Sequence, residues 1–136
     1  MKVKLEQNAK APTRAHDTDA GLDLYAMHGG LVRAHQTATF NTGVHVELPR
    51  GTAGILMPKS GMMTHHDLLT FGIVDEGYTG EILVHIFNCG GTDYSVSPGD
   101  KISQMLIVPV LYEPVEIVDS INGGDRGENG FGSSGR

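Results

Sequence analysis

The last twelve residues of the chain set charged, hydroxyl and aromatic side chains in a frame of glycines. Glycine lets backbone N–H groups turn towards an anion, and the planar guanidinium of Arg126 can bind a phosphate. The Ser133 hydroxyl and the amide of Gly132 could take further phosphate oxygens, whereas Phe131 offers a flat face to a base. This composition is typical of a lid over a nucleotide. A solvated terminus is the alternative, because most Gly/Ser-rich tails do not pack.

A carboxylate in a strand-like segment is the second candidate. Asp23 lies between Leu22 and Leu24, and the alternation of a strand points it away from both leucines. Such a carboxylate is usually a surface group. Mg²⁺, however, keeps most of its waters and is commonly held through one or two carboxylates together with substrate phosphates. Asp23 is therefore either solvent-facing or an outer-shell partner of a hydrated Mg²⁺.

Two further polar segments interrupt apolar runs. Lys59, Ser60 and Gly61 place a cation, a hydroxyl and a glycine between a strand and a possible short helix beginning after Ser60. Phosphates bind where free N–H groups converge at a helix start, although an ordinary N-cap by Ser60 beside a solvated lysine is the simpler interpretation. Gln104 lies among apolar residues. If its amide is buried, it needs a partner, which is either neighbouring backbone or a ligand.

The segment 71–82 carries the strongest mid-chain signal. Two apolar stretches flank a turn rich in glycine and acid, which predicts a β-hairpin with Asp75 and Tyr78 near its tip. The Asp75 carboxylate could orient and deprotonate a water molecule, and the Tyr78 ring could press on a sugar. The backbone of the hairpin could pair with a flat base. Turn formation by the aspartate and an exposed tyrosine ring are the alternatives.

The elements that must position these residues are short strands. Alternating or apolar runs at 44–48, 53–57, 81–88 and 102–110 are separated by turns rich in glycine and proline. This pattern predicts an all-β protein, a sandwich or jelly roll. The length of 136 residues fits one domain, which we place at 1–121 and follow with a glycine-rich tail at 122–136.

Composition limits the function classes. The formal net charge of −6 disfavours binding to a nucleic-acid backbone, so positive charge for a phosphorylated ligand must be local or supplied by a metal ion. A single cysteine, Cys89, excludes an intrachain disulfide. No apolar run approaches the ~20 residues of a membrane span, and the N-terminus lacks a signal-peptide core. We therefore expect a cytoplasmic protein without membrane contact.

Taken together and in order, these segments resemble the five motifs of the homotrimeric deoxyuridine triphosphatase (dUTPase) family. The matching segments are 20–24, 58–61, 72–80, 99–104 and 126–135. The resemblance implies a β-clip-like jelly roll with a flexible C-terminal arm, a homotrimer with active sites built from three chains, and Mg²⁺ as cofactor. It also implies hydrolysis of dUTP to dUMP and pyrophosphate through attack of water on the α-phosphorus.

Residue roles follow from the same resemblance. Asp75 would be the general base, and Tyr78 would pack on the deoxyribose and exclude a ribose 2′-hydroxyl. Main-chain groups around Gly72, Ile73 and Val74 and at Leu83 would pair with the uracil edge, on which Phe131 would stack. Asp23 would meet Mg²⁺ through water. The phosphates would be held by Lys59, Ser60, Gly61, Gln104, Arg126, Gly132 and Ser133.

One departure and two alternatives accompany the resemblance. The second motif usually carries arginine where this chain has Lys59, so a bidentate fork is replaced by a point charge. The nearest alternative is a dCTP deaminase or a bifunctional relative, which the complete glycine-rich fifth motif disfavours. A module that binds a regulatory protein partner on the same scaffold is the alternative from another class, although intact Asp75, Gln104 and Arg126 favour catalysis.

Overall fold

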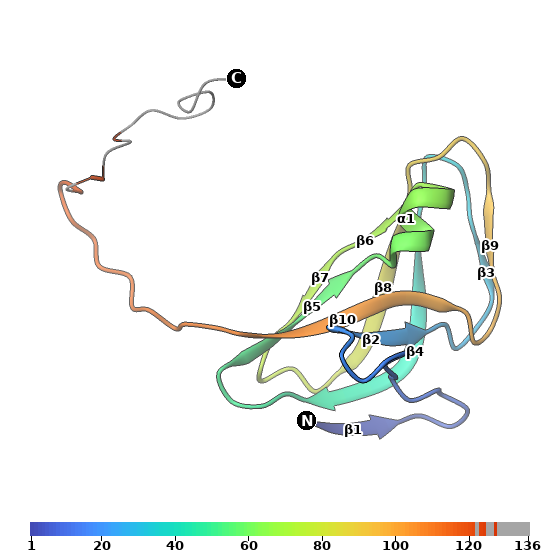
Figure 1. Ribbon diagram of the computed structural model, residues 1–136, viewed down its shortest axis with the longest axis horizontal. Coiled ribbons are helices and arrows are strands. Elements are labelled where there is room, and N and C mark those ends of the chain that lie inside the picture. Colours follow the sequence, from blue (N-terminus) through green and yellow to red (C-terminus); the bar gives the residue numbers. More distant parts are fainter. Residues whose placement is uncertain (122, 125–126, 128–136) are drawn as a thin grey trace.

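The computed structural model of the chain describes residues 1–121, 123, 124 and 127 (Figure 1). Its elements are almost all strands. In chain order they are β1 (Lys2–Leu5), β2 (Gly21–Tyr25), β3 (Gly30–Val32), β4 (Thr37–Glu47), β5 (Thr52–Met57), α1 (Ser60–His66), β6 (Leu68–Thr70), β7 (Gly72–Val74), β8 (Glu81–Asn88), β9 (Tyr94–Val96) and β10 (Lys101–Pro109). Within the part of the chain that is described, no helix has the length and apolar character needed to cross a membrane.

Two four-stranded sheets enclose the core. One has the order β1-β4-β8-β6 and the other β2-β10-β5-β7, while β3 and β9 form a separate pair. All the pairings between neighbouring strands are antiparallel. Alternate residues of β8, from Ile82 to Ile86, are buried and the residues between them are exposed, so one face of this strand packs on the core. The predicted all-β jelly roll is confirmed.

Several predicted elements agree closely with the structure. The run 81–88 is β8, 53–57 lies within β5, and 102–110 covers most of β10. The run 44–48 is only the second half of a longer strand, β4, which contains a bulge between Asn41 and His45. Gly43 has a φ of 64° at this bulge, a conformation that glycine adopts without strain.

The short helix is present, but its start differs from the prediction. Helix α1 begins at Ser60, so the capping position belongs to Lys59, which has extended backbone and makes no side-chain cap bond. Ser60 is therefore the first helical residue and not the N-cap. Met62 is the buried residue of this helix and anchors it on the core.

The predicted hairpin at 71–82 is wrong as a hydrogen-bonded pair. β7 pairs with β5 in one sheet, and β8 pairs with β4 and β6 in the other. The chain changes sheets at Phe71, because β6 before it pairs with β8 and β7 after it does not. Local apolar patterning indicated two strands joined by a turn, but burial in two different sheets decided their partners.

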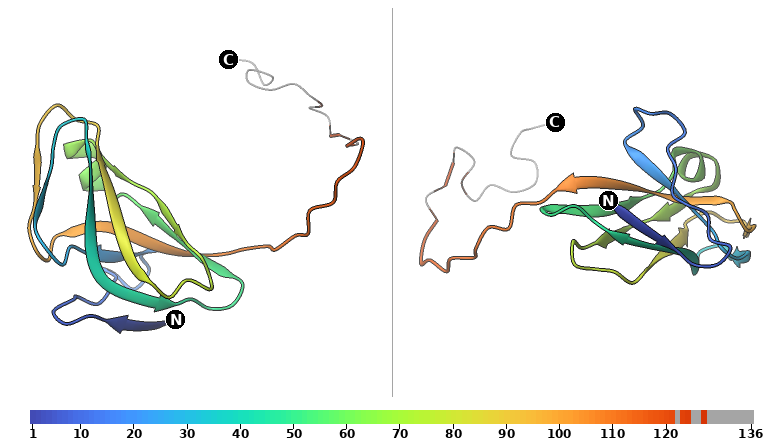
Figure 2. Two further views of the ribbon diagram at one scale, coloured as in Figure 1. Left: turned by 180° about the vertical axis from the view of Figure 1, so that it is seen from behind. Right: turned by 90° about the horizontal axis from the view of Figure 1, so that it is seen from below.

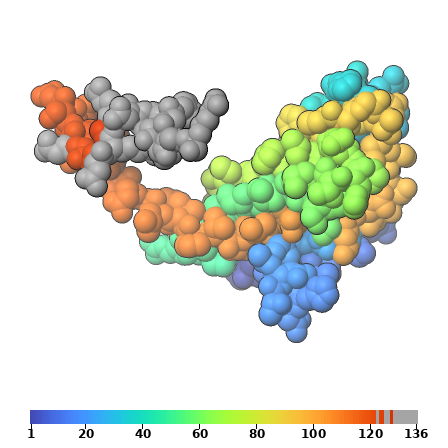
Figure 3. Space-filling view, turned by 45° about the horizontal axis from the view of Figure 1, so that its top comes forward, coloured from blue at the N-terminus to red at the C-terminus, as the bar shows by residue number. Residues whose placement is uncertain are grey.

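After β10 the chain leaves the body. Residues 111–121, which we call the arm, run away from both sheets in each view (Figures 1 and 2) and form a projection from the body (Figure 3). Its apolar side chains are almost wholly exposed, with exposed fractions of 84% at Leu111, 93% at Val115 and 95% at Ile117. Single exposed apolar residues are common, but the arm carries several of them within eleven residues.

Candidate active site

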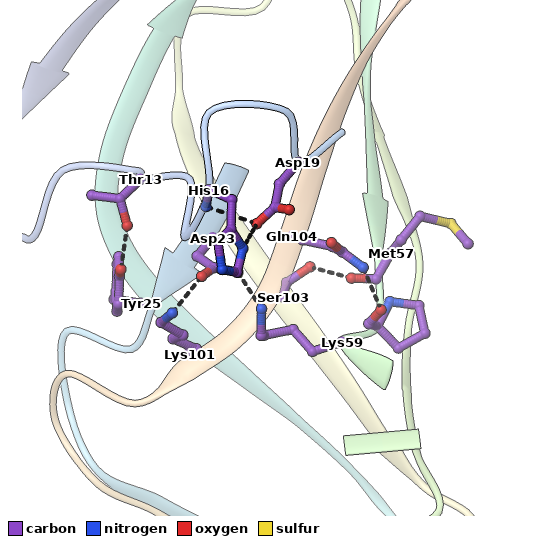
Figure 4. Close-up of polar contacts among 11 residues, drawn as sticks. Thr13, His16, Asp19, Asp23, Tyr25, Met57, Lys59, Lys101, Ser103 and Gln104 are labelled. Atoms are coloured by element: carbon purple, nitrogen blue, oxygen red, sulfur yellow. Dashed lines mark hydrogen bonds and ion pairs between the residues drawn. The ribbon is translucent and has the colours of Figure 1, made fainter. Parts of the chain in front are cut away.

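A carboxylate and two lysines meet on one sheet of the jelly roll (Figure 4). Asp23 lies in the middle of β2, and its partner across the ladder is Gln104 of β10. The Asp23 Oδ1 atom pairs with the ammonium of Lys59, and Oδ2 lies 2.6 Å from Nζ of Lys101. We call these three residues the Asp23 cluster. The solvent-facing interpretation of Asp23 is wrong, because this residue is only 3% exposed.

The charges of the cluster determine the ionisation of Asp23. Burial alone raises the pKa of a carboxyl, since it disfavours the charged form. Here the hydrogen bonds and charges of Lys101 and Lys59 together outweigh burial and hold the pKa of Asp23 below its ordinary value. The Asp23 carboxylate raises the pKa of Lys101 in turn. The cluster is therefore one anion between two cations near neutral pH.

Polar side chains of β10 hold the segment that leads into α1. The Ser103 hydroxyl donates to the carbonyl of Met57 at 3.1 Å, and the Gln104 amide donates to the carbonyl of Pro58 at 3.0 Å. A Cβ at Gly21 would lie 2.3 Å from Oε1 of Gln104, so this glycine makes room for the amide. The structure therefore pairs the Gln104 amide with neighbouring backbone, which was one of its two expected partners. A contact between Gln104 and a phosphate stays a prediction.

A cavity of about 270 Å³ lies between β7 and β8. Among the described residues, β7 is an edge strand that pairs with β5 alone, and β6 pairs with β8 from Ile86 to Asn88. Because β7 and β8 belong to different sheets, the edges that face the gap have no strand partner in this part of the chain. The cavity is lined by Leu56, Phe71, Gly72, Ile73, Val74, Tyr78, Glu81, Ile82, Leu83 and His85.

Tyr78 forms one wall of this cavity and is held in place by its neighbours. Its hydroxyl donates to the carbonyl of Glu81 at 2.9 Å. A Cβ at Gly80 would lie 2.4 Å from the Tyr78 hydroxyl and 2.5 Å from its ring, so the ring occupies this place only because residue 80 is glycine. The Glu81 carboxylate accepts bonds from the N–H of Gly43 and the amide of Asn41, at 2.7 and 2.8 Å. The bulge in β4 therefore supports the wall.

Asp75 lies at the end of β7, in the turn that leads to Tyr78. Its side chain is exposed, and its carbonyl accepts the N–H of Tyr78 at 3.0 Å. The neighbouring Glu76 accepts bonds from the N–H of Gly51 and from the Tyr112 hydroxyl, both at 2.8 Å. The turn is thus fixed by hydrogen bonds while the carboxylate of Asp75 stays accessible.

Most of the predicted site residues fall into two groups in the described part of the chain, whereas Asp75, in the turn after β7, belongs to neither of them. Gly72, Ile73, Val74, Tyr78 and Leu83 line the cavity. Lys59, Ser60, Gly61, Gln104 and Asp23 gather around the β5–α1 connection. No residue of the second group lines the cavity. Arg126, Phe131, Gly132 and Ser133 lie outside the described residues, so their roles stay predictions.

Sequence reasoning missed three residues that hold the site. Lys101 lies in the segment 99–104, and Glu76 and Glu81 lie in the segment 71–82, but the sequence analysis assigns none of them a role. Each makes contacts with segments remote in sequence, namely β2, the turn at Gly51 and the β4 bulge. The acidic residue directly after Asp75 was the one local signal, because two adjacent carboxylates repel unless one of them has a separate partner.

The predicted Mg²⁺ contact of Asp23 can be compared with the side chains that could coordinate a metal ion. Among the residues that the structure describes, no group of three or more His, Cys, Asp or Glu side chains could hold a metal ion. Asp23 has an ammonium at each oxygen, so direct coordination does not fit. Contact through water, with the phosphates supplying the inner ligands, fits once one lysine moves aside.

A jelly roll with a cavity between two strands of different sheets, and with an exposed carboxylate in the turn after one of them, is a scaffold that can hold a small molecule. The chain belongs to the dUTPase family, whose family model matches residues 7–135. The deoxyuridine 5'-triphosphate nucleotidohydrolase of Clostridium acetobutylicum is 39% identical over 135 residues, covering 97% of this chain and 93% of that protein. The enzyme of Rattus norvegicus is 34% identical, covering 98% and 66%.

Solved structures agree with the family assignment. The Staphylococcus bacteriophage 80alpha dUTPase with dUPNHPP has a TM-score of 0.92 at 29% identity, covering 99% of this chain and 98% of that one. A mutant dUTPase from phage phi11 of S. aureus, described with a structural Mg(II) ion, has a TM-score of 0.81 at 27% identity and covers 88% and 96%. The likeness therefore extends over nearly the full length of the chain.

Proposed function

We propose that this protein is a dUTP diphosphatase that hydrolyses dUTP to dUMP and pyrophosphate. The observation that carries the proposal is the cavity between β7 and β8, where two strand edges leave backbone groups without ladder partners. Membership of the dUTPase family and the phage structure with a dUTP analogue support the same conclusion.

The cavity suits a flat pyrimidine. The uracil edge presents both donors and acceptors, and the open edges of Gly72–Val74 and of β8 near Leu83 present the complementary N–H and C=O groups. Backbone recognition of this kind is rigid, because both strands are fixed by their outer partners. Cytosine has a different pattern of donors and acceptors and would leave cavity groups unpaired, which is unfavourable for binding.

Tyr78 would contact the sugar. Its ring forms one wall of the cavity and is oriented by the bond of its hydroxyl to the carbonyl of Glu81 and by the contact with Gly80. A fixed ring on one face of a deoxyribose leaves little space for a 2′-hydroxyl. Tyr78 would therefore select deoxyribonucleotides over ribonucleotides.

Asp75 would act as general base. Its carboxylate is exposed in the turn that directly follows the cavity-lining strand β7, and this turn is fixed by the bonds of its neighbours. It would orient a water molecule and accept its proton as the water attacks the α-phosphorus, with pyrophosphate as the leaving group. Phosphoryl transfer of this kind depends mainly on positioning and on charge stabilisation.

The phosphates would lie near the β5–α1 connection. The Ser60 hydroxyl, the Gly61 amide and the Gln104 amide are candidates for phosphate contacts, and Lys59 supplies positive charge. A bound magnesium ion would neutralise phosphate charge and would be met by Asp23 through water. Lys59 would then leave its ion pair with Asp23 for the phosphates, which compensates for the loss of that pair.

We further propose that the active enzyme is a homotrimer with each site shared among three chains. Within the described part of one chain the cavity and the β5–α1 connection share no lining residue, an arrangement in which a neighbouring chain would supply the phosphate contacts. The arm exposes Leu111, Val115 and Ile117, and a neighbouring chain would cover them. A sedimentation experiment that finds a stable and active monomer would contradict this assembly.

The tail, residues 122–136, would act as the lid of the site. The support is its sequence, which carries Arg126 and Ser133 for phosphates, Gly132 for a close backbone approach, and Phe131 for the uracil face. Truncation after Asp125 should leave a folded trimer with severely reduced turnover, because water exclusion and the phosphate clamp are lost. Unchanged activity in the truncated chain would contradict the lid.

A single assay tests the main proposal. Pyrophosphate release is measured from dUTP, UTP, dTTP and dCTP with and without Mg²⁺, together with ammonia release from dCTP. We expect pyrophosphate from dUTP in strong preference to the other three nucleotides, and more of it with Mg²⁺. Ammonia from dCTP would support a deaminase or bifunctional enzyme instead. No turnover of any nucleotide, from protein with a cooperative melting transition, would support a binding module.

A further inference from the structure

Three segments that are remote in sequence meet at one carboxylate oxygen. Oε2 of Glu76 accepts a bond from the N–H of Gly51 and a second from the hydroxyl of Tyr112, each at 2.8 Å. The carbonyl of Gly51 accepts the N–H of Val110 at 2.9 Å. The turn after β4, the turn after β7 and the root of the arm are therefore joined by three hydrogen bonds, which we call the Glu76 junction.

Charge strengthens the junction. The N–H of Gly51, followed by the Tyr112 hydroxyl, lowers the pKa of Glu76, and the nearby Arg50 acts in the same direction. The bond to Glu76 raises the pKa of Tyr112, so its hydroxyl stays a donor. A hydrogen bond to a charged acceptor is stronger and more directional than one between neutral groups. The junction is thus a charged clamp at neutral pH.

The Glu76 junction lies next to the proposed general base and at the start of the arm. Glu76 directly follows Asp75, and Tyr112 lies at the start of the exposed arm, directly after Leu111. We propose that Glu76 is a positioning residue that fixes the Asp75 carboxylate and the exit of the arm in one arrangement. This inference rests on the proposed function, in which Asp75 orients the attacking water and the arm carries the lid to a neighbouring chain.

Geometry makes the clamp sensitive to side-chain length. Both donors converge on a single oxygen of Glu76, so glutamine, which keeps one oxygen at the same reach, can accept both bonds. Aspartate is one methylene shorter and does not reach them together, and alanine accepts neither. A misplacement of about 1 Å at a reacting group can lower turnover about 10²-fold. The order of activity should therefore be Glu, Gln, then Asp and Ala.

The experiment measures kcat and KM for dUTP and the melting temperature of the assembled full-length protein. Glu76→Ala and Glu76→Asp should lower kcat about 10- to 100-fold with KM changed less than about threefold. Glu76→Gln should restore kcat to within about threefold of the unmodified protein. Tyr112→Phe, which removes only the hydroxyl, should lower kcat about threefold and have no further effect in the Glu76→Ala background.

Matched controls use residues outside the junction. Glu47→Gln alters a surface carboxylate paired with Lys2, and Tyr94→Phe removes a hydroxyl near α1. Both should leave kcat unchanged. If Glu76→Gln is as impaired as Glu76→Ala, or if kcat losses only follow the melting temperature across all variants, the positioning role is wrong.

Amide hydrogen exchange tests the junction independently of substrate. The Gly51 amide should exchange faster in Glu76→Ala than in the unmodified protein and unchanged in Glu47→Gln. Equal exchange in both variants would contradict the junction itself. Failure of the unmodified protein to hydrolyse dUTP would contradict the proposed function, whereas the exchange result would still decide whether Glu76 holds the turn.

Discussion

At Asp23, three segments bring a carboxylate and two ammonium groups together, and the acid is only 3% exposed. Between β7 and β8, the chain leaves two strand edges apart and lines the gap with backbone and apolar side chains. The Asp23 cluster is thus satisfied internally by side-chain charge. The cavity lies between strand edges that have no ladder partner among the described residues.

Because of this difference, we expect the Asp23 cluster to contribute mainly to stability and the cavity mainly to ligand binding. A carboxylate already paired with two cations contributes mainly to stability and to the positions of Lys59 and Lys101 until a competing charge arrives. Unpaired backbone groups in a fixed gap gain most when a ligand fills it, because their partners are otherwise supplied by water. Changes at the Asp23 cluster should therefore alter folding first, and changes around the cavity should alter turnover and specificity first.

The largest effect is expected beside the cavity. Asp75→Asn keeps the size and turn propensity of the residue but removes general-base assistance, so turnover of dUTP should fall by a factor of ~10²–10⁴. Affinity for a non-hydrolysable dUTP analogue and the melting temperature should stay close to those of the unmodified protein. Single-turnover kinetics and calorimetry check both parts. Activity near that of the unmodified protein would show that Asp75 is not the base.

The next effect should be on folding, at the Asp23 cluster. Asp23→Ala leaves two lysines facing each other without their anion, and breaking a buried pair costs 3–5 kcal/mol in general. Because the Lys59 and Lys101 side chains are 28% and 41% exposed, we expect a smaller loss, about 2 kcal/mol of unfolding free energy. Urea unfolding measures it. An unchanged urea midpoint would indicate that hydration of the two lysines makes up for the loss of their ion pairs with Asp23.

A smaller effect on specificity should appear at Gly80. A Cβ there would lie 2.4 Å from the Tyr78 hydroxyl, so Gly80→Ala must displace the tyrosine ring. We expect kcat/KM for dUTP to fall about tenfold, which equals about 1.4 kcal/mol, and discrimination against UTP to weaken. The control is Gly91→Ala, because a Cβ at that glycine meets nothing within 4 Å. Equal discrimination in both variants would argue against Tyr78 as the sugar wall.

The smallest effect should be the acid dependence of stability. The pKa of Asp23 is held below its ordinary value of 3.8, so the unfolded chain binds the proton more readily than the folded one. The stabilisation is then fully present above pH 3.8 and is lost as the pH falls through the lowered pKa. Melting temperatures followed from neutral pH to about pH 2 should therefore fall less steeply for Asp23→Asn than for the unmodified protein. Parallel curves would contradict the lowered pKa.

The longer strands could be predicted from the sequence, because burial of one face gives a strand such as β8 an alternating pattern. The run 81–88 coincides with β8 for this reason. The pairing of 72–74 could not be predicted, since its apolar residues are compatible with either sheet and only packing chose β5. Lys101 was missed as well, because its partner Asp23 is remote in sequence and comes close only across the β2–β10 ladder.

By itself the sequence determined the class of fold, the short helix after Pro58, the ordered motifs and the individual residues with chemical roles, since these depend on local pattern and residue type. Tertiary structure decided which of those residues meet. It buried Asp23 between two lysines, split the predicted hairpin into two sheets and so opened the cavity, and joined Glu76 to Tyr112. The physical reason is that ladder partners and buried ion pairs are chosen by long-range packing, which local periodicity does not record.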